Sequence, residues 1–172
     1  IGGIIDQDVV SIVKQSFAAY PWGDKVKLLA LINDTVGTLL TRRYHDQYCD
    51  IAGIVGTGTN FCYLEQLKNI HTLSPPQKER YREPEMVINI ESGNFNKLYQ
   101  NIYDRTLDLN SLNKGEHILE KMVSGLYLGE LVRLVLIDLT SKGFLFHEDV
   151  MHEIIAVTTQ KENFDTTFMS EI

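Results

Sequence analysis

Apolar residues recur at helical spacing in several parts of the chain and predict its helices. Between residues 8 and 20 they fall on one side of a helix, which the Pro-Trp-Gly-Asp run of residues 21–24 ends. Residues 34–44 predict a second helix, because Asp and Thr at its start are good caps. The same spacing predicts three more helices, over residues 98–107, 116–142 and 150–155.

The helix predicted over residues 116–142 is the longest, and Gly143 ends it. It is apolar on most sides, which predicts that it is buried. Its apolar stripe is typical of a protein core rather than of a cofactor site, and consists of Leu126, Tyr127, Leu131, Leu134 and Val135.

Short runs rich in Val, Ile, Leu and aromatic residues predict strands. Residues 25–33 lack helical spacing and suit a buried strand. Residues 49–55 and 60–65 predict two strands joined by a Gly-Thr-Gly-Thr turn, and residues 86–90 predict another strand. Residues 71–84 have no periodicity and predict an exposed loop. Strands mixed with helices predict an α/β fold.

Composition narrows the class of protein. The chain has 172 residues, of which 44% are hydrophobic and 23% charged, which is enough for one sizeable core and predicts a soluble globular protein. A net charge of −7 and the lack of a basic run argue against nucleic-acid binding. Charged residues interrupt each apolar run before it reaches the length of a membrane span.

The two cysteines and the chain ends bear on cellular context. Cys49 and Cys62 lie thirteen positions apart, without zinc-site spacing, and are predicted to be reduced core residues. They favour a reducing compartment, hence a cytoplasmic location, and secretion stays an alternative. The chain begins with Ile1 rather than Met, and its last residues carry no helix stop, so we expect an internal fragment of a longer protein.

Two polar clusters carry candidate chemistry. Asn33 and Asp34 follow the first predicted strand, and the turn of residues 56–59 exposes backbone N–H groups. A carboxylate next to a turn that can hold phosphate suits activation of a hydroxyl, which predicts phosphoryl transfer to an alcohol. Taken alone, Asp34 could equally cap its helix, and the turn is more typical of a simple hairpin.

Five segments together resemble the eukaryotic hexokinases, in the same order along the chain. They are residues 31–41 (LINDTVGTLLT), 48–65 (YCDIAGIVGTGTNFCYLE), 87–95 (VINIESGNF), 111–133 (SLNKGEHILEKMVSGLYLGELVR) and 142–146 (KGFLF). The resemblance extends from about Asp8 to Ile172. It implies an actin-like ATPase (ribonuclease H-like) fold, with two α/β domains around a cleft. Residues 1–32 would then end the small domain, and residues 33–172 would begin the large domain.

The resemblance also implies roles for single residues. Asp34 matches the catalytic base that takes the proton of the sugar's 6-hydroxyl as it attacks the γ-phosphate of ATP. The hexose ligands would be Asn33, Asp34, Asn60, Glu91 and Glu120. Carboxylates accept hydrogen bonds and amides both accept and donate them, so this set can distinguish the hydroxyls of glucose or a similar hexose.

Phosphate binding would involve small residues in two segments. By resemblance these are Gly37 and Thr38 in the first, and Gly56, Thr57 and Gly58 in the second. Magnesium would arrive with ATP and be held by phosphate oxygens, so no protein-held metal cage is expected. The five histidines show no ligand pattern.

Some family features differ or are missing. Ser92 and Asn94 stand where hexokinases usually carry a tryptophan and a small residue, which alters the wall behind Glu91. The family's amino-terminal phosphate loop and its carboxy-terminal adenosine segment are not in these residues. We therefore predict a hexokinase whose isolated fragment is inactive. The alternatives are a catalytically inactive hexokinase relative that binds sugar as a sensor or interaction protein, and a purely structural piece.

Overall fold

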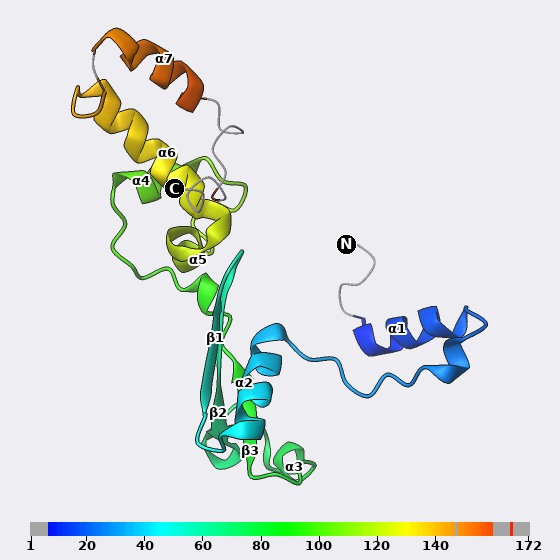
Figure 1. The fold of residues 1–172 in the computed structure, drawn as a ribbon. Helices are drawn as coiled ribbons and strands as arrows, with labels where there is room; N and C mark the ends of the chain where they lie inside the picture. The colour runs from blue at the N-terminus through cyan, green and yellow to red at the C-terminus, as the bar shows by residue number, and fades with distance from the viewer. Residues whose placement is uncertain (1–6, 147, 160–165, 167–172) are drawn as a thin grey trace. The chain divides into compact units, whose positions relative to one another are not determined.

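The computed structural model describes residues 7–146, 148–159 and 166. The chain forms two compact units, Ile1–Asp34 and Thr35–Ile172 (Figure 1). We describe each unit by itself.

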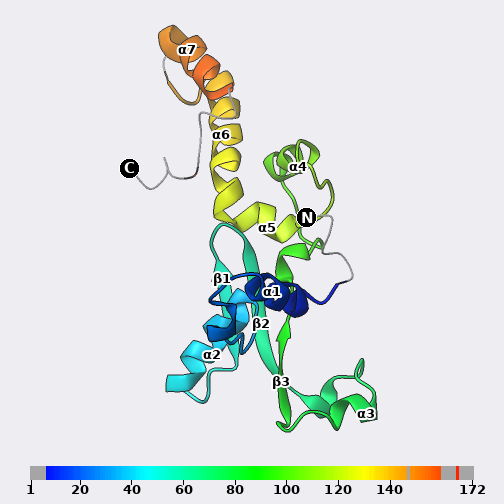
Figure 2. The same ribbon diagram turned by 90° about the vertical axis from the view of Figure 1, so that its right-hand side faces the viewer.

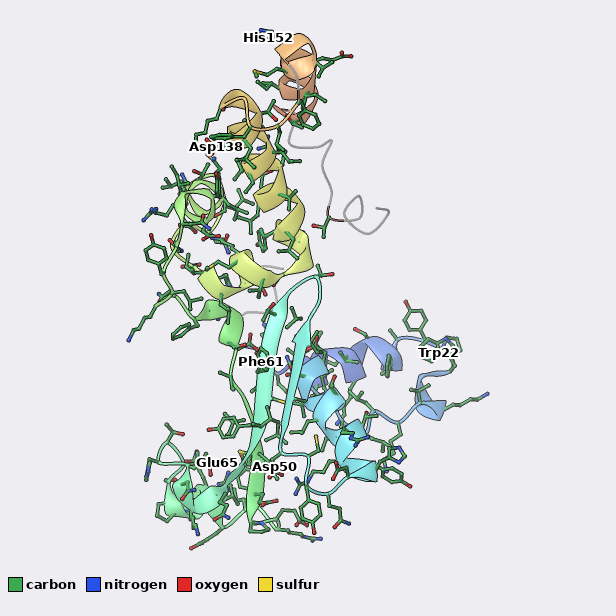
Figure 3. All side chains as sticks on the ribbon, turned by 60° about the vertical axis from the view of Figure 1, so that its left-hand side comes forward. Trp22, Asp50, Phe61, Glu65, Asp138 and His152 are labelled. Carbon is green, nitrogen blue, oxygen red and sulfur yellow. The ribbon has the colours of Figure 1, made fainter. Side chains whose placement is uncertain are left out.

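The first unit contains helix α1 (Val9–Ala18), which confirms the prediction for residues 8–20. The Asp8 carboxylate caps it by accepting a hydrogen bond of 3.0 Å from the Val10 N–H. Beyond the helix, the Trp22 ring stacks on Tyr20 with centroids 5.0 Å apart (Figure 3). A short 3₁₀ turn, Gly23–Lys25, follows.

The strand predicted over residues 25–33 is wrong in this structure. Residues 26–33 have no regular secondary structure, and Leu29 is 81% exposed. A strand needs a neighbour to accept its backbone hydrogen bonds, and the described part of this unit contains no other strand. Local composition alone therefore does not make this segment a strand.

The second unit is built on an antiparallel three-stranded sheet in the order β1-β2-β3. The strands are β1 (Ile51–Val55), β2 (Thr59–Gln66) and β3 (Glu85–Asn89), which confirms three of the predicted strands. Gly53 lies opposite Phe61. A Cβ on Gly53 would come within 2.2 Å of the Phe61 ring, so this glycine leaves room for the aromatic side chain (Figure 3).

Helix α2 (Asp34–His45) confirms the second predicted helix and lies beside the sheet (Figures 1 and 2). Its Arg43 forms ion pairs with Asp50, the residue before β1, and with Glu85, the first residue of β3. Leu39 on α2 and Cys62 on β2 are fully buried. Both cysteines are unpaired, and Cys49 is only partly buried, so the core prediction holds for Cys62 alone.

The segments between sheet and helices follow the prediction with two local changes. Residues 71–84 are mostly irregular and exposed, but they include one helical turn, α3 (Pro75–Lys78). Its cap, Ser74, donates hydrogen bonds of 2.8 Å from its N–H and its hydroxyl to Gln77 Oε1, as in a capping box. Helix α4 (Ile102–Leu109) begins four residues later than predicted. Its start is set by the Asn101 side chain, which accepts a 2.7 Å hydrogen bond from the Tyr103 N–H.

The long helix predicted over residues 116–142 is wrong as one helix. It forms α5 (Ile118–Val123) and α6 (Gly125–Ser141), separated by Ser124 in extended conformation. The first N–H groups of α6 bind the β1–β2 turn: Gly125 donates to the Gly56 carbonyl at 2.7 Å, and Leu126 donates to the Thr57 carbonyl at 3.3 Å. Tertiary hydrogen bonds thus take donors that a continuous helix would use internally.

Burial of α6 is also less complete than predicted. Leu126 is 63% exposed, and the other members of the predicted stripe are partly buried. Helix α7 (Glu148–Thr159) packs against α6 and confirms the helix predicted near residues 150–155 (Figure 2). Within the described residues, no helix has both the length and the apolar character to cross a membrane.

Candidate functional site

Three segments of the second unit meet at one end of the sheet: the β1–β2 turn, the residues after β3, and α5 (Figure 1). The turn is closed by the Gly56 N–H, which donates to the Gly58 carbonyl at 2.9 Å. Because β2 starts and β3 finishes here, polar residues at these strand ends lie near each other.

Glu120 in the first turn of α5 anchors this helix to the sheet. Its Oε2 accepts a hydrogen bond of 3.0 Å from the Thr59 N–H. At the other end of α5, the Ser124 and Thr59 hydroxyls share a buried hydrogen bond of 2.6 Å. Both ends of α5 therefore bind the first residue of β2, which leaves the Glu120 carboxylate with little freedom to move.

Two glycines allow this close approach. A Cβ on Gly58 would lie 2.8 Å from Glu120 Oε2. A Cβ on Gly93 would lie 2.8 Å from the Thr59 carbonyl oxygen and 3.2 Å from Glu120 Cβ. At Gly93 a side chain would meet the backbone of β2, so glycine is needed there, whereas at Gly58 it would displace the Glu120 carboxylate from the Thr59 N–H.

A chain of hydrogen bonds joins two more of the predicted ligands. Asn60 Nδ2 donates to Asn89 Oδ1 at 2.6 Å, and Asn89 Nδ2 donates to Glu91 Oε1 at 2.5 Å. Asn60 Oδ1 accepts from the N–H groups of Phe61 and Ser92, at 2.7 Å and 3.2 Å. Glu91 has a left-handed backbone with φ of 53°, which is uncommon for a residue other than glycine. Asn60 and Glu91 are thus held in one network.

Lys121, the residue after Glu120, forms a buried ion pair with Asp108. Lys121 is 2% exposed, and its Nζ donates to Asp108 Oδ1 and to the Asn113 carbonyl, both at 2.6 Å. Burial raises the pKa of Asp108, but hydrogen bonds from Lys121 and the Gly115 N–H outweigh it and lower the pKa overall. Since Lys121 pairs with Asp108, its ammonium does not neutralise Glu120.

Two further titratable side chains, Tyr127 and His117, lie close to the Glu120 carboxylate. The pKa of the Tyr127 hydroxyl is raised, chiefly by burial and further by the Glu120 charge. The His117 Nδ1 lies 3.9 Å from Glu120 Oε1. The site thus combines two carboxylates, Glu91 and Glu120, with amide groups at the end of a sheet.

Four predicted site residues lie on segments that precede the sheet. Asn33 and Asp34 are the last residues of the first unit. Gly37 and Thr38 lie on α2, where the Gly37 carbonyl accepts a hydrogen bond of 2.8 Å from the Thr41 hydroxyl. The start of α2 does reach the network, because the Thr35 hydroxyl lies 3.5 Å from Asn89 Oδ1.

Comparison with known protein families identifies the family of this chain. Two family models, both described as hexokinase, match residues 50–172 and 1–44. The chain belongs to the hexokinase family. It is 45% identical to human hexokinase HKDC1 over 149 residues, which are 84% of this chain and 16% of that protein. It is 39% identical to human hexokinase-1 over 173 aligned residues, which are 98% of this chain and 18% of that protein.

Solved hexokinase structures have the same fold. The hexokinase from Schistosoma mansoni complexed with glucose aligns with a TM-score of 0.67 and 36% identity, over 84% of this chain and 32% of that chain. A second hexokinase crystal structure aligns with a TM-score of 0.59 and 39% identity, over 77% of this chain and 27% of that chain. They confirm the predicted fold class, the actin-like α/β fold of hexokinases. The chain spans less than a fifth of the length of these two human relatives.

Three residues of the cluster around Glu91 and Glu120 were not predicted from the sequence: Asn89, Gly93 and Ser124. For Asn89 a signal was present, because it precedes the predicted ligand Glu91 by only two positions, close enough for the two side chains to meet. Nothing local identifies Ser124, whose partner Thr59 is 65 positions away.

Among the described residues, no group of three or more His, Cys, Asp or Glu side chains could hold a metal ion. That magnesium is held by ATP phosphates stays a prediction, as do the small and large domain limits at residues 32 and 33.

Proposed function

We propose that the protein containing this chain transfers the γ-phosphoryl group of ATP to the 6-hydroxyl of glucose or a similar hexose. Its hexokinase family membership supports this proposal, as does its likeness to a hexokinase complexed with glucose. The observation that carries it is the grouping of Asn60, Glu91 and Glu120 at one end of the sheet, through hydrogen bonds with Asn89 and Thr59.

These three residues supply what recognition of a sugar needs. Glu91 and Glu120 are acceptors for sugar hydroxyls, and Asn60 can both donate and accept. Glu120 is 25% exposed and is held by the Thr59 N–H, so one oxygen is fixed while the carboxylate keeps further lone pairs for a ligand. A bound hexose lacking the matching hydroxyl would cover an acceptor and leave it unpaired, which costs about 1–3 kcal/mol.

Asp34 is proposed as the general base. It is exposed at the start of α2, where its carboxylate would orient the 6-hydroxyl and take its proton during attack. The new bond joins the hexose oxygen to phosphorus, the bond from phosphorus to ADP breaks, and the proton passes to Asp34. Asn33, next to it, is proposed as a further hexose ligand.

Phosphate contacts are proposed for Gly37 and Thr38 and for the β1–β2 turn. Thr57 is exposed at the tip of this turn, so its hydroxyl and nearby N–H groups suit an anionic ligand. Magnesium bound to ATP would neutralise charge on the transferred group.

The test is Asp34→Ala in the intact protein, with Asp46→Ala as control. Asp46 follows the carboxyl end of α2 and pairs with Arg42. We expect Asp34→Ala to abolish turnover while hexose affinity, measured by titration calorimetry, changes less than about tenfold. The control should keep both. Near-normal kcat in Asp34→Ala would show that the base is another residue.

The alternative candidate is a sugar-binding relative without catalysis, which would keep the hexose ligands; Asp34, which can act as the base, weighs against it. Ser92 stands where hexokinases usually carry a tryptophan beside Glu91, and its buried hydroxyl has no hydrogen-bond partner among the described residues, so this substitution bears on hexose affinity rather than on the base. The same assays separate the two functions. A wild-type protein that binds hexose but forms no hexose phosphate would support the sensor.

A further inference from the structure

Asn89, the last residue of β3, lies between two of the proposed hexose ligands. We propose that Asn89 is a positioning residue, which orients the side chains of Asn60 and Glu91 and thereby determines hexose affinity. This inference rests on the proposed function and adds a residue to it.

Glu91 determines which groups donate and which accept along this network of hydrogen bonds. An ionised carboxylate only accepts, so Asn89 must turn its NH₂ group toward Glu91 Oε1, 2.5 Å away. Asn89 Oδ1 then faces Asn60 and accepts from Asn60 Nδ2 at 2.6 Å. The orientation of the Asn89 amide therefore follows from the charge of Glu91.

The same polarity continues into Asn60. The Asn60 Nδ2 is directed at Asn89, so the Asn60 Oδ1 points the other way. This oxygen accepts hydrogen bonds from the N–H groups of Phe61 and Ser92, at 2.7 Å and 3.2 Å. One N–H of Nδ2 is used by Asn89, and the second can donate to a sugar hydroxyl. Asn89 and these two backbone N–H groups thus together determine that Asn60 presents an N–H donor to a hexose, and Asn89 holds the side chain at its Nδ2 end.

The backbone holds Asn89 in place for this role. It pairs with Cys62, which is fully buried on β2, and the Ile90 N–H donates to the Phe61 carbonyl at 3.0 Å. The Thr35 hydroxyl, 3.5 Å from Asn89 Oδ1, adds a contact from the residue that follows Asp34. Asn89 therefore contacts three segments that carry proposed site residues.

The solvent exposure of Asn89 and Glu91 distinguishes a role in positioning the ligands from a role in stabilising the fold. Asn89 and Glu91 are exposed, so water competes for their hydrogen bonds and these contribute little to folding. A bound hexose would exclude that water and strengthen the same bonds. Loss of Asn89 should therefore change hexose binding much more than stability.

The experiment compares Asn89→Asp and Asn89→Ser with Asn69→Asp in the intact protein. Asn69 also donates to a carboxylate, Glu65 Oε1 at 2.9 Å, at the opposite end of β2. Asn89→Asp keeps the acceptor for Asn60 but removes the donor to Glu91, and Asn89→Ser is too short to reach either side chain. We expect the hexose KM to rise about tenfold to hundredfold in both, with the ATP KM and urea midpoint unchanged, and no change in Asn69→Asp.

A pH profile adds a readout that a purely structural role would not affect. In Asn89→Asp two carboxylates face each other, so one proton shared between them restores a donor as the pH falls. The hexose KM of this variant should approach the wild-type value at acidic pH, relative to wild type measured at the same pH. An unchanged KM in both Asn89 variants, or an equal rise in Asn69→Asp, overturns the inference.

The proposed function and this inference fail in different ways. If the wild-type protein forms no hexose phosphate, transfer is disproved, but calorimetric titration with glucose still measures the role of Asn89. A glucose Kd that is equal in wild type and both Asn89 variants then disproves the inference alone.

Discussion

The two ends of the three-stranded sheet use polar side chains in different ways. At the turn end, Thr59 shares a buried 2.6 Å hydrogen bond with Ser124 and donates its N–H to Glu120. At the other end, where Asp50 lies (Figure 3), Arg43 bridges the carboxylates of Asp50 and Glu85, whose side chains are 62% and 40% exposed.

This difference shows which polar contacts demand fixed geometry. A buried polar group without a partner is costly, so the turn end admits few arrangements of its side chains. Exposed ion pairs exchange with water and contribute about 0–1 kcal/mol each, so the far end tolerates change. A site that must hold carboxylates still is therefore expected at the turn end.

The largest expected effect comes from the buried pair beside Glu120. Lys121→Met would leave the Asp108 carboxylate and the Asn113 carbonyl without the ammonium that both bind at 2.6 Å. Urea unfolding should show a loss of about 3–5 kcal/mol. Lys142→Met is the control, because Lys142 makes a similar 2.7 Å pair with Asp138 but is 56% exposed, and it should lose less than about 1 kcal/mol. Equal losses would contradict the comparison.

The close packing at the turn end gives the next effect. Gly93→Ala would place a Cβ 2.8 Å from the Thr59 carbonyl oxygen, and should cost about 1–3 kcal/mol in urea unfolding. In Gly56→Ala the nearest atom to the new Cβ is Ile54 Cγ2 at 3.8 Å, so this control should keep its stability. If both variants unfold at the same urea concentration, the approach of Gly93 is not tight.

The Asp108 pair also predicts a pH dependence. Burial raises the pKa of Asp108, and the Lys121 and Gly115 hydrogen bonds lower it more, so its folded pKa lies below 3.8. A lowered carboxyl pKa stabilises the fold above the unfolded pKa, and this stability is lost as pH falls through the folded pKa. As the pH is lowered below about 4, the urea concentration at the unfolding midpoint should therefore decrease. It should decrease less in Asp108→Asn than in the wild-type protein. An identical decline in that variant would assign the acid sensitivity to other groups.

The smallest effect is expected at the far end of the sheet. Arg43→Met removes both exposed ion pairs, to Asp50 and Glu85, and should change the free energy of unfolding by less than about 1 kcal/mol. A loss as large as that of Lys121→Met would mean that exposure is a poor guide to the worth of these pairs.

Local pattern was enough for much of the second unit. Helix α2 and strands β1, β2 and β3 were predicted because their apolar spacing and caps agree with the structure they adopt. Residues 26–33 failed, because a strand depends on a partner that composition does not specify. The helix break at Ser124 failed because apolar periodicity continues across it.

By itself the sequence determined the family resemblance, most of the elements and the candidate carboxylates, since each rests on residue types at short spacing. Tertiary structure decided how Glu120 meets Thr59, and how Asn89 joins Asn60 to Glu91. The physical reason is that a hydrogen bond between residues far apart in sequence depends on which groups the fold brings within about 3 Å of each other. Short spacing along the chain relates Asn89 to Glu91, but it contains no information on the pairs Asn60–Asn89 and Thr59–Glu120.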